Sequence, residues 1–509
     1  MNATIRQGLA RYKRRIERRL DNRNTQGCDR PAITASNIRY ELAERSRAIS
    51  AGGIGVIHCL VKALGLDEAI NRRVKLLKLN MPYHESDHVL NIAYNALAGG
   101  TCLEHLELLR TNEVYLDALG ARRIPDPTTA GDFCRRFDAW DIHLLQETIN
   151  EARLTVWRQQ PEEFFDEATI DGDGTIVETD GECKQGMDIS YKGEWGYHPL
   201  LISLANTNEP LYLLNRSGNR PSHENAATYF DLAVALCRRA GFRRILLRGD
   251  TDFTQSERLD RWDEQLVEFI FGIDAMPNLY ELAEKLPDSA WKPLRRPKPQ
   301  SRGQPRQKPD NVKERIVEAR GYKNIRLREE HVAEFPYRPT KCGKTYRVIV
   351  VWKDLDESVQ GELFKKHRCF FYITNNRRHS AENIVRKANG RCNQENLIEQ
   401  LKNGVRALTA PVDNLLSNWA YMVMAGLAWS LKAWAALLLP ERGRRVEQRR
   451  EEKQTLLRMD FATFRQALIN VPAQIIRTSR RIVYRLLSWN RWQPVFFRLL
   501  DQLALPLRC

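Results

Sequence analysis

The order of patterns between residues 164 and 250 constrains the fold more than any other feature of this sequence. Four short apolar segments rich in strand-forming residues come first, followed by one amphipathic helix and then one further strand. The expected strands are 164–177, 187–191, 199–205, 211–215 and 243–247, and the expected helix is 222–240. An early group of strands, joined by a strand that follows a helix, predicts a mixed sheet and therefore an α/β fold.

The regions on either side of this segment have a different pattern. Residues 1–24 and 36–158 are expected to be helical, and so is the chain from residue 381 to its end. Between residues 291 and 328, thirteen lysines and arginines stand against three acids, and five prolines lie between Pro293 and Pro309. That composition predicts a poorly structured basic loop.

The charge of the chain indicates a polyanionic partner. Its 509 residues, enough for about two to four domains, carry a formal net charge of +16. Lysine and arginine displace counterions from phosphates, so nucleic acid is the leading candidate, although a basic protein without such a partner has the same composition. A helix capped by Thr128 or Thr129 carries Arg135 and Arg136, which we expect to contact DNA.

Cysteine spacing and apolar segments bear on where the protein acts. The ten cysteines form no CxxC pair, and no histidine lies at zinc-knuckle spacing from them, which argues against a structural zinc site and favours reduced, mostly buried thiols. The N-terminus lacks the apolar core of a signal peptide. Residues 419–439 are long enough to span a bilayer, but Ser430 and Lys432 interrupt them, so a buried helix is expected.

Aspartates lie at the ends of two of the expected strands. Asp171 and Asp173 lie in IDGDGT at residues 170–175, and Asp250 and Asp252 lie in RGDTDF at residues 248–253. The flanking glycines are small, so we expect them to let a substrate backbone approach the carboxylates. Taken singly, an aspartate after a strand is usually a turn residue or a helix cap.

A third group of charged residues lies on a helix. Spacings of four, four and three residues place Arg391, Glu395, Glu399 and Lys402 on one face. Alone, such a face is usually a solvated ladder of ion pairs. Two aspartates at strand ends and one helix glutamate, on a basic protein, are nevertheless the minimum set for phosphodiester chemistry with two Mg²⁺ ions, which bind through a few carboxylates and the substrate phosphate.

With these motifs, the sequence resembles the DDE transposases of bacterial insertion sequences, most closely the insertion-sequence-1380 family and more broadly the insertion-sequence-4 type. The segments that carry the resemblance are IDGDGT at 170–175, YKGEWGYHPLLISLANTNEPLYLLNRSGN at 191–219, RGDTDF at 248–253 and FYITN at 371–375, within a similar region of about 85–490. The broader group has tyrosine, arginine, glutamate and lysine at fixed intervals on the helix. Arg391, Glu395 and Lys402 fit those intervals, but Ala388 stands at the tyrosine position.

The resemblance implies roles for particular residues. Asp173, Asp250 and Glu395 would be the catalytic metal ligands, with Asp171, Asp252 and Glu399 as their respective competitors. Arg391 and Lys402 would face DNA phosphates near the cleaved bond. The alternative for both basic residues is a surface ion pair with Glu395 or Glu399.

The resemblance also implies an architecture and partners. It implies a ribonuclease-H-like mixed-sheet catalytic core with an inserted domain, preceded by a helical N-terminal domain and followed by a helical basic tail. The expected cofactor is Mg²⁺, with Mn²⁺ as a substitute, and the expected partners are transposon-end and target DNA, bound by a homodimer in the bacterial cytoplasm. A stand-alone nuclease on the same fold, and an inactive DNA-binding protein derived from a transposon, are the alternative functions.

The expected units follow from these assignments. Residues 1–160 form a helical DNA-binding region, 161–255 and 371–440 the two parts of the catalytic core, 256–370 the insertion with the basic loop, and 441–509 the basic helical tail.

Overall fold

The computed structural model describes residues 3–19, 47–78, 82–295, 324–359, 362–478 and 481–507. Its centre is a nine-stranded mixed sheet in the order β10-β11-β12-β13-β9-β8-β2-β6-β7. The strands are β2 (Glu167–Gly174), β6 (Leu200–Leu204), β7 (Glu209–Leu214), β8 (Arg244–Gly249), β9 (Glu268–Ile273), β10 (Lys292–Pro293), β11 (Asn324–Tyr337), β12 (Tyr346–Val359) and β13 (Glu362–Thr374). The expected mixed α/β sheet is therefore present.

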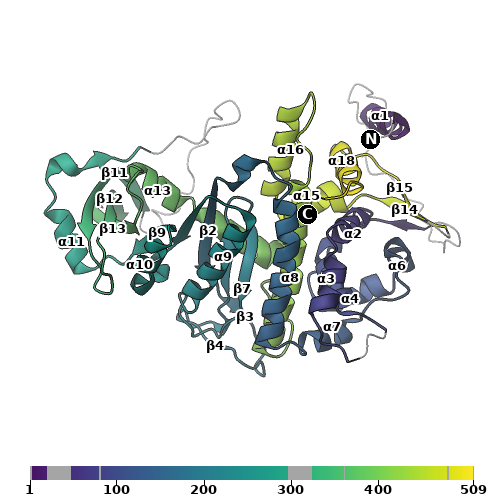
Figure 1. Cartoon of the computed structure of the whole chain (residues 1–509), viewed down its shortest axis with the longest axis horizontal. Helices are drawn as coiled ribbons and strands as arrows, with labels where there is room; N and C mark the ends of the chain where they lie inside the picture. Colours follow the sequence, from purple (N-terminus) through teal and green to yellow (C-terminus); the bar gives the residue numbers. More distant parts are fainter. Residues whose placement is uncertain are drawn as a thin grey trace.

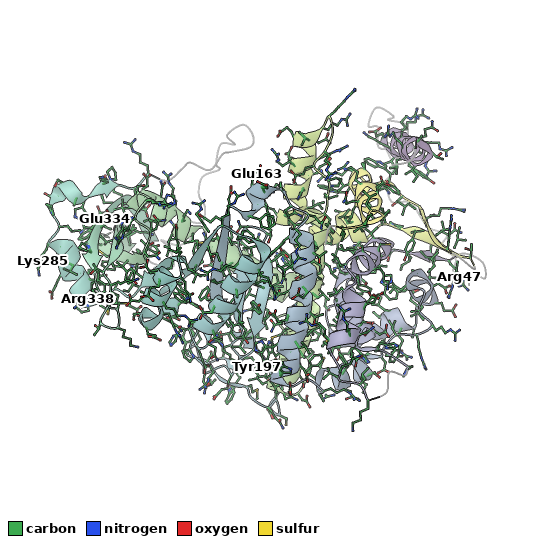
Figure 2. The ribbon with its side chains drawn as sticks, in the orientation of Figure 1. Arg47, Glu163, Tyr197, Lys285, Glu334 and Arg338 are labelled. Carbon is green, nitrogen blue, oxygen red and sulfur yellow. The ribbon has the colours of Figure 1, made fainter. Side chains whose placement is uncertain are left out.

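Two parallel pairings lie within this otherwise antiparallel sheet. β8 runs parallel to β2 on one side and to β9 on the other. β8 reaches its place after the crossover helix α9 (Ala226–Ala240), whose Phe230 is fully buried against the sheet. A small second sheet, with β3 (Val177–Glu178), β5 (Trp195–Tyr197) and β4 (Asp188–Ile189), follows the end of β2. Figure 2 labels Glu163, just before β2, and Tyr197, which ends β5 of the small sheet.

The N-terminal region is helical, as expected. It contains α1 (Ala3–Arg19), α2 (Ile54–Ala63), α3 (Leu66–Arg73), α4 (Glu85–Ala98), α5 (Leu106–Arg110), α6 (Glu113–Leu119), α7 (Pro127–Cys134) and α8 (Ala139–Trp157). The cap of α7 differs from the expectation, because Asp126 accepts a hydrogen bond from Thr129 N over 2.9 Å. Pro127 then occupies the first turn, where no amide donor is needed, so the helix begins earlier than the threonines suggested.

One long helix crosses the middle of the molecule. α15 (Leu415–Leu437) is long and apolar enough to cross a membrane, but its most apolar stretch is entirely buried inside the protein. It packs on α4 and α8, and Figure 1 shows it beside α8 between the sheet and the N-terminal helices. Lys432 is buried in α15, where it donates to the carbonyl of Leu457 over 2.9 Å, and burial lowers its pKa to about 7. The expectation of a buried helix here is confirmed.

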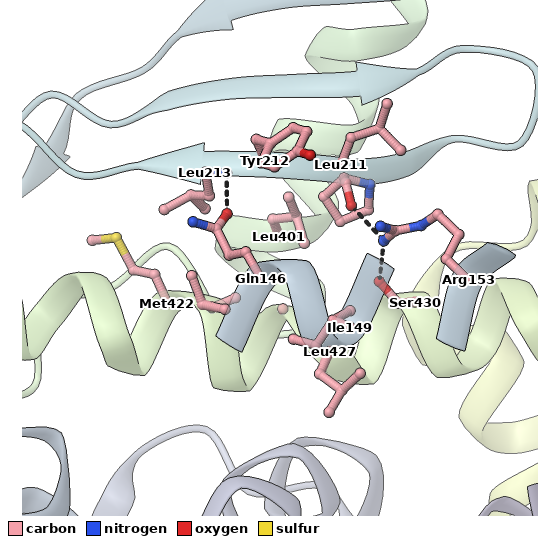
Figure 3. A pocket seen from close by; sticks show the side chains of 14 residues that line it. Gln146, Ile149, Arg153, Leu211, Tyr212, Leu213, Leu401, Met422, Leu427 and Ser430 are labelled. Atoms are coloured by element: carbon pink, nitrogen blue, oxygen red, sulfur yellow. Dashed lines mark hydrogen bonds between the residues drawn. The ribbon is translucent and has the colours of Figure 1, made fainter. Parts of the chain in front are cut away.

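A buried ion pair and a small cavity lie beneath β7. Arg153 and Glu209 pair at 3.0 Å with almost no exposure. Beside them a cavity of about 40 Å³ separates α8, α15 and β7 (Figure 3). Gln146 accepts from Leu213 N over 2.7 Å at one end of the cavity, and Arg153 donates to Ser430 Oγ over 3.3 Å at the other. Polar anchors at both ends thus fix α8 against the sheet.

The C-terminal region is not wholly helical, which corrects the expected helical tail. After α16 (Val446–Arg458) and α17 (Phe461–Phe464), the strands β14 (Ala473–Arg477) and β15 (Ile482–Leu486) form a hairpin, and α18 (Gln493–Leu503) follows. β1 (Ala48–Ile49) pairs with β14, so the N- and C-terminal regions share one sheet. The β-branched pairs in AQIIR and IVYRL favour strands.

The segment expected as an insertion contains part of the central sheet. β9 and β13 lie wholly or largely within 256–370 and extend the sheet beside β8, so the sheet continues past residue 255. The same segment contributes α10 (Ser256–Glu264) and α11 (Pro277–Glu284), and α13 (Ala381–Asn389) and α14 (Cys392–Glu399) follow it. Most of the expected basic loop at 291–328 lies outside the described residues.

Candidate active site

Strand register places the two expected aspartates side by side. β2 and β8 are parallel, with Asp171 opposite Arg248 as the last paired residues. Two residues further along each strand are Asp173 and Asp250, which therefore leave adjacent strands at the same end and on the same face. Neighbouring strands lie about 4.8 Å apart, so the two carboxylates come within reach of common ligands.

The glycines beside these aspartates have a role different from the expected one. A Cβ at Gly172 would lie 2.5 Å from the ring of Phe230, and one at Gly249 would lie 2.6 Å from Cβ of Phe253. Helix α9 and the turn after β8 thus fill the space beneath the strand ends. The expectation that these two glycines make room for substrate is wrong; they let the chain itself pack closely under the site.

Asp171, the competitor of Asp173, has a buried partner. Its side chain is 1% exposed, and Arg248 donates to both of its oxygens over 2.7 Å. Arg248 also donates to the carbonyl of Lys387 over 2.6 Å, which ties the strand to the end of α13. Burial raises the pKa of Asp171, and Arg248 opposes that shift. With both oxygens engaged, Asp171 has the environment of a structural carboxylate.

Asp173 and Asp250 have the electrostatics of a cation site. Burial raises the pKa of Asp173 to about 6; the charge of Arg391 lowers it and that of Asp250 raises it further. The pKa of Asp250 is also raised by burial, with Arg391 opposing and Asp252 adding to the shift. Asp250 accepts from the backbone N–H of Asp252 over 3.1 Å, and Asp252 itself is exposed. A nearby cation stabilises the ionised form of two partly buried carboxylates whose pKa values burial has raised.

Helix α14 brings the third acid to the same place. Arg391, the residue before α14, donates to Asp173 Oδ2 over 2.9 Å, and its second nitrogen lies 3.8 Å from Glu395 Oε1. The side chain of Glu395 is 61% exposed in the first turn of the helix. The three expected acids thus lie near one guanidinium group, that of Arg391, and Glu395 is the most exposed of them.

This helix is anchored by a residue that no sequence pattern indicated. The buried Gln394 donates to the carbonyl of Leu201 over 2.9 Å. Leu201 is the partner of Asp173 in β6, so this bond holds the first turn of α14 directly beside Asp173. A side-chain amide that bonds to a distant backbone carbonyl leaves no spacing pattern in a sequence, which explains why it was missed.

The two remaining charged residues of the helix face lie farther along. Glu399 is exposed and accepts from Asn403 over 2.6 Å within its own helix. Lys402 donates to the carbonyl of Ile176, just after β2, over 2.6 Å, and burial lowers its pKa. Neither Arg391 nor Lys402 is a freely solvated side chain, and Arg391 makes the expected contact with Glu395 together with a closer one to Asp173.

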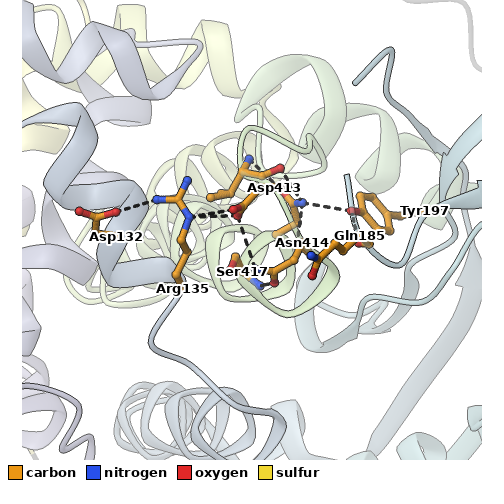
Figure 4. A network of polar contacts seen from close by, with 9 residues as sticks. Asp132, Arg135, Gln185, Tyr197, Asp413, Asn414 and Ser417 are labelled. Atoms are coloured by element: carbon orange, nitrogen blue, oxygen red, sulfur yellow. Dashed lines mark hydrogen bonds and ion pairs between the residues drawn. The ribbon is translucent and has the colours of Figure 1, made fainter. Parts of the chain in front are cut away.

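The two arginines expected to contact DNA, Arg135 and Arg136, directly follow α7 and differ in their surroundings. Arg135 is shared between Asp132, at 2.7 Å, and Asp413, at 3.0 Å, and the network continues through Asn414 at the start of α15 (Figure 4). Arg136 is exposed and forms no ion pair among the described residues. Arg135 therefore ties α7 to the start of α15, whereas Arg136 is open to a partner.

A basic hollow lies at the other end of the molecule. Arginines from α1, α16, α18 and the segments next to them surround a hollow of about 620 Å³: Arg6, Arg444, Arg445, Arg449, Arg491 and Arg498. The single carboxylate in its lining is that of Glu452, which pairs with Arg498. Figure 1 shows these helices at the opposite end from β3 and β4, which follow the end of β2. So many unneutralised guanidinium groups favour a phosphate-bearing partner.

Comparison with known proteins identifies a family. A family model described as "Transposase DDE domain group 1" matches residues 34–506. No curated protein matches the chain. Among solved structures, a cryo-EM structure of a piggyBac transposase synaptic complex with hairpin DNA matches with a TM-score of 0.35 and 10% identity, over 83% of each chain. At that level of similarity, nothing is transferred from it.

Proposed function

The chain belongs to the family described as Transposase DDE domain group 1, and from that premise we propose that it cleaves DNA at the ends of an insertion sequence and transfers the strands to a target. The motifs quoted above support a bacterial element of the insertion-sequence-1380 family, with the enzyme acting in the cytoplasm. The observation that carries the proposal is the contact of one guanidinium, that of Arg391, with both Asp173 and Glu395, beside Asp250.

The donor set suits divalent metal ions. Asp173, Asp250 and Glu395 would hold Mg²⁺, or Mn²⁺ in its place, because hard cations prefer carboxylate oxygens. When bound, the metal supplies an activated attacking oxygen and stabilises the leaving one. Because the pKa of Asp173 is about 6, this carboxylate is ionised and available as a ligand at neutral pH.

The basic residues of the site have positioning roles in this proposal. Arg391 would hold Asp173 in place before the metal binds and pair with a DNA phosphate afterwards, because a guanidinium forms strong hydrogen bonds with either group. Lys402 keeps the segment after β2 in position through the carbonyl of Ile176 and has further N–H groups for DNA. Asp171 and Arg248 lock the two strands together beneath the reacting groups.

Besides the active site, DNA would contact the chain at two places. The net charge of +16 supports a polyanionic partner. Arg136 and the N-terminal helices are proposed to bind the transposon end, with residues 1–160 as the DNA-binding region. The basic hollow between α1, α16 and α18 supports a second contact with phosphates away from the cleaved bond. Two copies of the chain would bring two ends together, as a homodimer.

The experiment that tests the proposal separates cleavage from joining. The purified chain is incubated with Mg²⁺ and duplexes that carry the DNA flanking its own gene, either intact or already cut at the element's end. We expect cleavage of the first substrate and joining of the second to a plasmid, with both lost in Asp250→Asn and retained in the matched control Asp252→Asn. Cleavage without joining would identify a stand-alone nuclease, and binding without either reaction an inactive DNA-binding protein.

A further inference from the structure

Three metal-binding side chains converge on the hairpin strands of the large sheet. Glu329 and His331 belong to β11 and Asp354 to β12, and one ligand atom from each lies within 4.8 Å of the other two. Glu329 is directly opposite Asp354 in the strand register, and His331 is two residues from Glu329. All three side chains therefore leave the same face of the sheet, the one that carries α11.

The charges of this group are unbalanced. Two carboxylates directly opposite each other on adjacent strands repel, which destabilises the pairing of the strands. Among the described residues, no lysine or arginine forms an ion pair with Glu329 or Asp354. Lys353 and Glu330, which pair at 3.5 Å, lie on the other face of the sheet. A cation between the carboxylates would remove the repulsion.

The surroundings of Asp354 leave one of its oxygens free for a ligand. His367 of β13 bonds to Asp354 Oδ1 through Nδ1 at 2.6 Å, and Trp352 Nε1 donates to the same oxygen over 2.9 Å. Among the described residues, no group donates a hydrogen bond to the other oxygen, Oδ2. One oxygen of Asp354 lies within 4.8 Å of the ligand atoms of Glu329 and His331. Hydrogen bonds that orient a carboxylate in this way are a regular feature of metal sites.

We propose that Glu329, His331 and Asp354 bind one divalent transition-metal ion, such as Zn²⁺, with His367 and Trp352 orienting Asp354. An imidazole with two carboxylates suits Zn²⁺ and similar ions, whereas Mg²⁺ prefers oxygen ligands alone. In tetrahedral geometry, ligand atoms about 2.0–2.2 Å from the ion lie about 3.3–3.6 Å apart, so a small movement of the side chains closes the site. The cysteine pattern argues against a zinc knuckle but does not bear on ligands of this kind.

The site would stiffen a hairpin that projects past the candidate active site. β13 pairs with β9 only from Phe371 to Thr374, and Phe371 faces Ile273 at the end of β9. β9 is parallel to β8, whose end leads to Asp250. The part of β13 that precedes Phe371, and the parts of β12 and β11 paired with it, therefore extend past the end of the sheet that carries Asp250. The metal would join β11 to β12 in that projecting part.

Metal binding can be measured without reference to transposition. The full chain carrying Asp173→Asn, Asp250→Asn and Glu395→Gln, which removes the proposed catalytic ligands, is titrated with Zn²⁺ against a fluorescent zinc indicator. We expect one ion per chain, retained in millimolar Mg²⁺. His331→Asn should weaken Zn²⁺ binding by more than a hundredfold, and His367→Asn by about tenfold to a hundredfold. His223→Asn, which removes an exposed imidazole elsewhere, should leave it unchanged.

The variant Glu329→Gln distinguishes the loss of a metal ligand from a loss of folding. Glu329 is exposed, so its neutral amide should leave the circular dichroism spectrum of the chain unchanged while weakening Zn²⁺ binding as His331→Asn does. The proposal fails if the parent chain takes up no Zn²⁺, if His331→Asn and Glu329→Gln bind it as tightly as the parent, or if Mg²⁺ displaces it. Each of these results leaves the transposase assignment untouched, because the catalytic acids are absent from every chain compared.

Discussion

Arg391 donates a hydrogen bond to Asp173 over 2.9 Å, although the two residues come from a helix and a strand separated by more than two hundred positions. The same guanidinium lies 3.8 Å from Glu395. Arg391 thus supplies positive charge where the proposed metal ions would supply it. Arginine and metal are alternatives for the same carboxylates, which makes Arg391 the most informative residue of the site.

Replacement of Arg391 should separate metal binding from DNA cleavage. Arg391→Ala removes a positive charge next to the proposed ligands, so at pH 8 the DNA-free chain should bind Mn²⁺ more tightly, by about three- to tenfold. Cleavage should fall, because the phosphate contact is lost. Mn²⁺ titration followed by electron paramagnetic resonance measures the first effect, and Arg386→Ala, an exposed arginine on α13 paired with Glu382, is the control. Unchanged Mn²⁺ affinity in Arg391→Ala would show that the arginine does not compete with metal.

Metal affinity should depend on pH through Asp173. Its pKa is raised to about 6, chiefly by burial, so below pH 6 the carboxyl holds a proton that a metal must displace. Mn²⁺ affinity should fall by about tenfold per pH unit below 6 and level off above it. In the metal-free chain, the folded state keeps this proton at pH values where the unfolded state has lost it, so the stability contributed by this group declines as pH rises from about 4 to 6. Calorimetric Mn²⁺ titrations between pH 5 and 8 test the affinity, and a flat profile would contradict it.

Alanine substitutions at Asp171 and Asp173 should have different effects, the first on stability and the second on DNA cleavage. Asp171→Ala leaves Arg248 buried without its carboxylate, which should lower the free energy of unfolding by about 3–5 kcal/mol. Asp173→Ala removes a carboxyl whose pKa burial has raised, so it should leave stability nearly unchanged while abolishing cleavage. Thermal denaturation and a cleavage assay on the same two preparations check both statements. A stable, inactive Asp171→Ala with an active Asp173→Ala would reverse the assignment.

Glu395 and Glu399 offer a matched pair on one helix. Glu395→Gln keeps the shape of the side chain but binds Mg²⁺ weakly, so cleavage should fall to background while folding and DNA binding persist. Glu399→Gln should cost little, since Glu399 is exposed and accepts its hydrogen bond from Asn403, one turn along the chain. If Glu395 were only a surface ion pair of Arg391, its loss would cost under about 1 kcal/mol and leave activity intact. An active Glu395→Gln beside an inactive Glu399→Gln would assign the metal to the next turn of the helix.

The basic hollow should contribute to DNA affinity but not to the cleavage step. Replacing Arg444 and Arg445 by alanine removes about two phosphate contacts, so the slope of log affinity against log salt concentration should decrease by about two. The rate of cleavage at saturating DNA should remain the same. Fluorescence anisotropy at several salt concentrations measures the slope, with Arg238→Ala and Arg239→Ala on α9, two exposed arginines outside the proposed DNA contacts, as the charge-matched control. An unchanged slope in the hollow variant would remove the hollow from the DNA contact surface.

The sequence predicted those parts of the fold that depend on local pattern. The strands that became β2, β6, β7 and β8 were expected close to their observed positions, because apolar runs and glycine-rich bends mark them. The hairpin of β14 and β15 was expected as helix, because short strands with arginines between apolar residues resemble an amphipathic helix until a partner strand is known. β1, with two residues, has no pattern of its own and exists through its pairing with β14.

The candidate site was predictable as a set of residues but not as a set of contacts. Strand-end aspartates and helix spacing indicated Asp173, Asp250 and Glu395. The fork from Arg248 to Asp171 was not predicted, because it depends on strand register across a 77-residue separation. The packing of the Phe230 ring against Gly172 was also not predicted. A glycine next to an acid has the same sequence pattern whether a substrate or a side chain fills the space beside it.

The enclosure of α15 limits how this protein can change during evolution. The helix contacts α2, α4, α7 and α8 from the N-terminal region, β7 from the central sheet, and α16 and α17 from the C-terminal region. A lineage that acquired new N-terminal helices by recombination would place unmatched side chains against this helix, where volume mismatches are costly. Specificity for new DNA ends should therefore arise by point substitution at exposed positions such as Arg136. Exchange of the whole region would succeed only where residues 415–437 are inherited with it.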